Sequence, residues 1–244
     1  MTLTARPWLI VVALLSLLAL SPAHAGMTPQ EVEIFKDAKA WAEKGEAEGQ
    51  LNLGICYTKG EGVAKDDVQA VAWFRKAAVQ GFAPAQTLLG NCYFGGEGVP
   101  KDQALAVTWY RKAAEQGNAS AQMSLGECYG GGKGVEKDFV QAVKWYRKAS
   151  EQGYVLAQYN LGGCYANGEG VAKDQIEAYA YWNQGTVEYA RKKLAALEKQ
   201  MTAEQIAAGK KRTKELKREL EDKIYENALQ KEFAARIAEK PDRK

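Results

Sequence analysis

A period of 36 residues dominates the sequence and restricts its possible folds more than any other feature. Residues 81–116 read GFAPAQTLLGNCYFGGEGVPKDQALAVTWYRKAAEQ, and the same pattern occurs 36 residues before and 36 residues after. Two sets of residues keep this spacing throughout: Cys56, Cys92, Cys128 and Cys164, and Gly45, Gly81, Gly117 and Gly153. Such a period indicates stacked units, because 36 residues are too few to bury a core alone.

Each full unit predicts two helices joined by a glycine-rich turn. In the second unit Ala85, Leu89 and Cys92 fall at helical spacing in the first helix, and Trp109 and Ala113 in the second. The turns end in aspartates suited to cap the second helix: Asp66, Asp102, Asp138 and Asp174. A glycine inside a helix costs about 1 kcal/mol relative to alanine. Its recurrence in the first helices therefore predicts a close approach by the paired helix at Gly54, Gly90, Gly126 and Gly162.

The repeats define the expected domain organisation. The chain divides into a signal peptide (1–25), a capping helix (26–44), repeats 1 to 4 (45–80, 81–116, 117–152 and 153–184), a second capping helix (185–200) and a charged C-terminal helix and tail (201–244). Repeat 4 is shortened, so its second helix is expected to end about one turn early. The last helix opens with the capping box TAEQ and carries a thin apolar seam: Leu216, Leu220, Tyr225, Leu229 and Phe233.

The first 25 residues have the three parts of a secretory signal peptide. Arg6 supplies the positive start, residues 8–20 an apolar core, and residues 23–25 a small-residue cleavage site, AHA. The apolar core is shorter than the roughly 20 residues that span a bilayer. We therefore expect cleavage after Ala25 and a periplasmic or secreted protein. No later segment predicts a membrane span.

The mature chain lacks histidine, because the only one, His24, lies in the signal peptide. This excludes histidine-based triads and histidine-ligated zinc. Cleavage also leaves 32 basic and 30 acidic residues, a balance that predicts no binding to nucleic acid. No catalytic, cofactor-binding or metal-binding residue is predicted, and we expect the protein not to be an enzyme.

The pattern LGxCYxxGxGVxxD followed by AxxWYRKAAEQG closely resembles the Sel1-like repeat, a relative of the tetratricopeptide repeat. The resemblance implies an all-α fold, a right-handed α-solenoid of four helix-turn-helix repeats with helical caps. It also implies a concave face, lined by the first helices, that binds proteins or peptides. Some secreted relatives have been linked to penicillin binding and β-lactamase activity. They carry two cysteines per repeat, whereas this chain carries one and lacks the SxxK, SDN and KTG motifs after residue 25.

Two further features predict ordinary structural roles. Equivalent cysteines in neighbouring repeats should lie roughly 8–10 Å apart, beyond the Cα separation of about 4.4–6.8 Å that a disulfide needs. We therefore predict buried, reduced thiols. The Arg–Lys pairs at 75–76, 111–112 and 147–148 are expected on a solvated face. The basic cluster 210–218 is expected in a solvated helix, although it could also meet anionic lipid or cell-wall polymer.

The candidate binding surface consists of first-helix positions that vary between repeats. They stand at i, i+4 and i+7, and therefore share one helix face. The predicted protein-binding residues are Leu51, Ile55, Thr87, Asn91, Phe94, Met123, Glu127 and Tyr159. The alternative interpretation is that this face is an inner wall, with its apolar residues packed between repeats.

The sequence thus predicts a monomeric, non-catalytic, periplasmic or secreted scaffold that binds a protein or peptide. Two other hypotheses stay open. One is penicillin-binding or β-lactamase-like activity, and the other is a structural contact with the cell envelope through the C-terminal helix.

Overall fold

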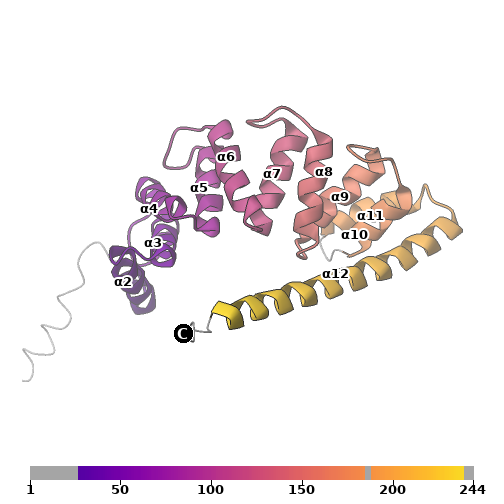
Figure 1. Ribbon diagram of the computed structural model, residues 1–244. Helices are drawn as coiled ribbons and strands as arrows, with labels where there is room; N and C mark the ends of the chain where they lie inside the picture. Colours follow the sequence, from indigo (N-terminus) through magenta and orange to yellow (C-terminus); the bar gives the residue numbers. More distant parts are fainter. Residues whose placement is uncertain (1–26, 185–187, 239–244) are drawn as a thin grey trace, which may run out of the picture. The chain divides into compact units, whose positions relative to one another are not determined.

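The computed structural model describes residues 27–184 and 188–238, and every regular element in these ranges is an α-helix (Figure 1). The predicted signal peptide lies outside the described residues. The chain divides into two compact units, Met1–Lys101 and Asp102–Lys244, each described by itself below. No helix in the described ranges is long and apolar enough to cross a membrane.

The helices follow the predicted order of cap, repeats, second cap and long helix. The N-terminal unit contains α2 (Pro29–Glu43), α3 (Ala47–Lys59), α4 (Asp67–Val79) and α5 (Ala83–Gly95). The C-terminal unit contains α6 (Gln103–Glu115), α7 (Ala119–Gly131), α8 (Phe139–Ser150), α9 (Val155–Asn167), α10 (Gln175–Gln184), α11 (Glu188–Glu198) and α12 (Ala203–Ala238). Within each unit, helices adjacent in sequence from α2 to α10 pack against one another. The predicted fold class, an all-α array of paired helices, is confirmed.

The helix ends form where the sequence predicts them. Thr28 opens α2 with a complete capping box, in which Glu31 N donates to Thr28 Oγ1 at 3.2 Å and Glu31 Oε2 accepts from Thr28 N at 2.6 Å. Asp66 and Asp138 cap α4 and α8 by accepting one backbone N–H each. Gly60 ends α3 at φ +77°, a left-handed conformation that only glycine adopts without strain.

The glycines inside the first helices lie against large aromatic rings of the second helices. A Cβ atom added at Gly54, Gly126 or Gly162 would stand 2.5 Å from the ring of Phe74, Tyr146 or Trp182, respectively. That distance is far inside van der Waals contact, so only a bare backbone lets the ring lie flat on the helix. The close approach predicted from the recurring glycine is confirmed at these three positions.

Buried glutamines link one helix pair to the next, a role that the sequence analysis did not identify. In the C-terminal unit, Gln122 Nε2 donates to the Ala114 carbonyl at 3.1 Å, and Gln122 Oε1 accepts from Gln152 Nε2 at 2.8 Å. Gln122 is buried, and it satisfies a carbonyl in the last turn of α6. In the N-terminal unit, Gln86 donates to the Ala78 carbonyl at 3.1 Å in the same way.

The end of the array departs from the regular repeat. The described part of helix α10 has 10 residues against 13 in α4 and in α6, and the early end of repeat 4 stays a prediction. Helix α11 buries Ala190 and Leu197 as a second cap. The predicted seam of α12 does not form one face: Leu216 is buried, whereas Tyr225 and Leu229 are 66% and 47% exposed. The apolar residues of α12 thus divide between two sides of a largely exposed helix.

The four cysteines are buried in the first helices and are free. Burial raises the pKa of Cys92, Cys128 and Cys164 to about 11, and nearby carboxylates add to the effect. Burial also raises the pKa of Cys56. These thiols are therefore protonated at neutral pH and behave as small apolar side chains.

We predict that Gly126→Ala destabilises the fold, because its Cβ atom would meet the Tyr146 ring, which is buried and cannot move away. The loss of unfolding free energy should be about 1–3 kcal/mol. The matched control is Gly163→Ala in α9, where no atom lies within 4 Å of the added Cβ. This control should gain about 1 kcal/mol from helix propensity. Chemical denaturation measures both, and equal effects would contradict the packing explanation.

We predict that the native protein reacts slowly with thiol reagents and that the denatured protein presents four thiols without reductant. Stability should also fall as the pH rises from 9 toward 11. The pKa of the folded-state thiols is raised, so their contribution is complete below the unfolded value and lost above it. Thiol titration and denaturation at several pH values test this. Fewer than four thiols in denaturant would disprove it.

Candidate functional site

The predicted binding residues of the N-terminal unit differ in accessibility. Asn91 is exposed, and Leu51, Ile55 and Phe94 are half-buried. Thr87 is only 4% exposed, and its hydroxyl donates to the Ala83 carbonyl at 2.9 Å. Thr87 is therefore part of the helix packing and does not belong to an accessible surface.

In the C-terminal unit, the predicted residues divide in the same way. Glu127 is exposed, but Met123 is 5% exposed and lies in the core with Tyr146. Tyr159 is half-buried and packs edge-on against Tyr189, with ring centroids 4.5 Å apart. For Met123, and in part for Tyr159, the inner-wall interpretation describes the side chain better. The binding role of the accessible residues stays a prediction.

A groove in the C-terminal unit is a candidate site. Its volume is about 400 Å³. It is lined by residues from α7 to α11, most of them aromatic rings, glycines and amides: Gly130, Gly131, Phe139, Tyr146, Tyr159, Asn160, Gly163, Cys164, Asn167, Glu169, Trp182 and Lys193. A Cβ atom at Gly163 would meet nothing within 4 Å, so the hollow exists where a side chain is missing.

The sequence could have located this groove more precisely than it did. Gly163 stands in repeat 4 at the position that Glu127 occupies in repeat 3, one of the variable first-helix positions. The predicted set contained Tyr159 but omitted Gly163, Asn160 and Trp182. A variable position that becomes glycine was the signal for a hollow.

The chemistry of the groove suits binding and shows no activated nucleophile. Cys164 lines it, but burial raises the pKa of this thiol to about 11, the opposite of what a cysteine nucleophile needs. Glu127 is exposed as a whole residue, but desolvation of its carboxyl group raises its pKa, while Lys133 acts in the opposite sense. Within the described residues, no cluster of three His, Cys, Asp or Glu side chains could hold a metal ion.

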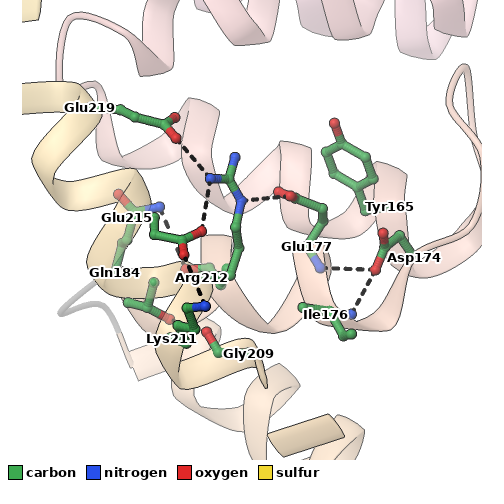
Figure 2. Close-up of polar contacts among 12 residues, drawn as sticks. Tyr165, Asp174, Ile176, Glu177, Gln184, Gly209, Lys211, Arg212, Glu215 and Glu219 are labelled. Carbon is green, nitrogen blue, oxygen red and sulfur yellow. Dashed lines mark hydrogen bonds and ion pairs between the residues drawn. The ribbon is translucent and has the colours of Figure 1, made fainter. Parts of the chain in front are cut away.

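A second candidate is a charged cluster where α12 packs along α10 (Figure 2). Arg212 Nε donates to Glu177 Oε1 at 2.7 Å, and its Nη1 atom contacts Glu219 at 2.8 Å and Glu215 at 3.5 Å. Asp174 caps α10 by accepting the backbone N–H groups of Ile176 and Glu177. Three carboxylates pair with Arg212, so the cluster connects α12 to α10 and has a structural role.

Changes in repeat 4 explain why α12 packs there. Asn183 and Gln184 replace the Arg–Lys pair of repeats 1 to 3, which removes two positive charges from the surface facing a basic helix. The Asn183 amide donates to Thr213 Oγ1 at 3.2 Å. In repeats 1 and 3 the position of Glu177 is glutamine, and only repeat 4 offers Arg212 a carboxylate there.

In the earlier repeats, the Arg–Lys pairs make contacts that the sequence analysis did not predict. Arg111 donates to the Tyr129 hydroxyl at 3.0 Å, and Arg147 to the Tyr165 hydroxyl at 3.1 Å. Lys112 and Lys148 lie over the rings of Trp109 and Trp145, each 4.5 Å from the ring centroid.

Comparison with known proteins identifies the repeats. The family model described as Sel1 repeat matches residues 47–82, 83–118, 119–154 and 155–185. The crystal structure of c5321, a protective antigen present in uropathogenic Escherichia coli strains and displaying an SLR fold, is similar, with 35% sequence identity and a TM-score of 0.72. The match covers 80% of this chain but only 43% of c5321.

A Sel1 repeat protein from Oxalobacter formigenes is also similar, with 34% identity and a TM-score of 0.63 over 76% of this chain and 84% of that one. No curated protein matches the chain. The four matched repeats cover more than half of the sequence and coincide with the helix pairs of the structure. The chain therefore belongs to the Sel1 repeat family.

Proposed function

We propose that this protein is a non-catalytic scaffold that binds a protein or peptide through the groove of repeats 3 and 4. Sel1 repeat proteins mediate protein–protein interactions, which supports the general class. The observation that carries the specific proposal is the open hollow at Gly163, bordered by Tyr159, Trp182 and Tyr146. Aromatic walls with a few amide groups suit a peptide that inserts an apolar side chain and hydrogen-bonds through its backbone.

The aromatic rings of Tyr159 and Trp182 favour a partner side chain that is large and apolar. The Tyr159 and Trp182 rings lie 6.5 Å apart at a tilt of 35°, and Trp182 Nε1 donates to the Tyr159 carbonyl at 3.0 Å. This bond holds one wall of the groove in place before any ligand arrives, which reduces the entropy lost on binding. Asn160 and Asn167 stand beside it as hydrogen-bonding groups.

We also propose that the protein is exported and that its signal peptide is removed after Ala25. The tripartite pattern of residues 1–25 supports this. The intact mass of the protein recovered from the cell envelope should correspond to a chain starting at Gly26. A mass that includes residues 1–25 would contradict export by this route.

The groove is tested by filling it. Gly163→Leu should keep or raise stability, because the position is helical and has open space, and it should abolish capture of envelope proteins by cross-linking. Truncating Tyr159 is a poorer test, because its packing on Trp182 and Tyr189 makes a loss of stability unavoidable. Capture by the Gly163→Leu protein at the wild-type level would place the binding surface elsewhere.

The control for this experiment is Lys144→Leu on α8, which adds one leucine at another exposed helical position. It should leave both stability and capture unchanged. If the control also loses capture, an added apolar residue interferes in a general way, and the groove is not the cause.

A further inference from the structure

Helix α12 is attached to the array through its first half. Gly209 lies against the Tyr179 ring, where an added Cβ would be 2.6 Å away, and Thr213 bonds to Asn183. Leu216 is buried in the core of repeats 3 and 4. An ion pair between Lys223 Nζ and Glu151 Oε1 at 2.6 Å adds to this attachment.

The opposite face of this first half is basic and exposed. A helix turns by about 100° per residue, so residues two positions from Leu216 point away from the array. Lys214 and Arg218 occupy these positions, and three more lysines lie on the same side: Lys210, Lys211 and Lys217. All five are exposed, with Lys211 at 82% and Arg218 at 85% of their side-chain surface.

Along the same outer face, the second half of the helix is acidic and apolar. Tyr225 follows Leu216 by nine residues, or about two and a half turns, and therefore points away from the array. Tyr225 is 66% exposed and Leu229 is 47% exposed, as expected for side chains that point away from the array. Carboxylates lie near the two side chains on this face, and all are exposed: Glu221, Asp222 and Glu232.

We propose that α12 pairs in antiparallel orientation with α12 of a second copy of this chain. We define the outer face as the exposed side of residues 210–232, which has a basic half and an acidic half. Antiparallel pairing places the basic half of one helix against the acidic half of the other. Parallel pairing would bring like charges together. Sequence alone predicted a monomer, because the polarity of this face appears only once α12 is seen to pack through its other side.

The pairing has a defined centre. A two-fold axis at residue 223 places Lys214 of one helix opposite Glu232 of the other, since both stand nine residues from the axis and both lie on the outer face. Lysine stems can cover the exposed rings and methyl groups of Tyr225 and Leu229. The contact extends over about 34 Å of helix. It is smaller than a standard stable interface of about 1,600 Å², so the dimer should be weak and sensitive to salt.

An anionic membrane fits this face less well than a second copy. The basic half would be attracted to acidic headgroups, but the carboxylates on the same face would be repelled. The proposal does not depend on the groove of repeats 3 and 4, which lies on other helices.

The first test is analytical ultracentrifugation of the mature protein at low and high salt. Lys214→Glu and Glu232→Lys should each weaken the dimer by about tenfold or more, because each creates two like-charge contacts across the axis. The double variant exchanges the charges and should restore association to near the wild-type level. Both residues are exposed, and circular dichroism will verify the fold. A monomer at every concentration at low salt, failure of the double variant, or binding only to anionic vesicles would overturn the proposal.

The second test fixes the orientation by cross-linking. Glu221→Cys lies near the axis and should be joined to its copy by a short bis-maleimide, while the four native thiols are buried. Lys211→Cys is the matched control on the same face. Antiparallel pairing separates its two copies by about 36 Å, so it should not cross-link. Cross-linking at position 211, or none at 221, would rule out antiparallel pairing.

Discussion

The contact between a bare helix backbone and a large aromatic ring determines the geometry of this array. Phe74, Tyr146 and Trp182 occupy the same position in their second helices, and each lies on a glycine of the preceding first helix. The ring can vary in chemistry because the glycine accepts any flat surface. The glycine cannot vary, since one methyl group would force the helices apart. Ala142 and Ala149, which lie in the same core as Tyr146, are fully buried.

The last repeat shows how a repeating surface is brought to an end. Repeat 4 keeps the ring-on-glycine contact through Trp182 and Gly162 but replaces the basic pair by Asn183 and Gln184. A neutral surface with one carboxylate, Glu177, then receives a basic helix that the earlier repeats would repel. The remaining basic side chains in this part of α12 face outward and are available to a partner: Lys210, Lys211, Lys214, Lys217 and Arg218.

Much of the fold could be predicted because the signals are local and repeated four times. Caps such as Thr28 and Asp138 and the role of the helix glycines followed from spacing and residue type. The site was predicted less well. A variable position can be accessible, as Asn91 and Glu127 are, or buried by its neighbours, as Thr87 and Met123 are, and sequence spacing does not separate the two cases. The glutamine links were missed because Gln122 looks polar in sequence, while its partner, the Ala114 carbonyl, belongs to another helix.

The carboxylate of Glu177 also has a consequence for how such a protein can change over evolutionary time. Only the final repeat carries this acid beside a neutral Asn–Gln pair, so α12 can recognise the end of the array whatever its length. Duplication or loss of an internal 36-residue segment would leave this contact site on the final repeat unchanged. The number of repeats, and with it the reach of the protein, can therefore drift while the C-terminal helix keeps its anchorage.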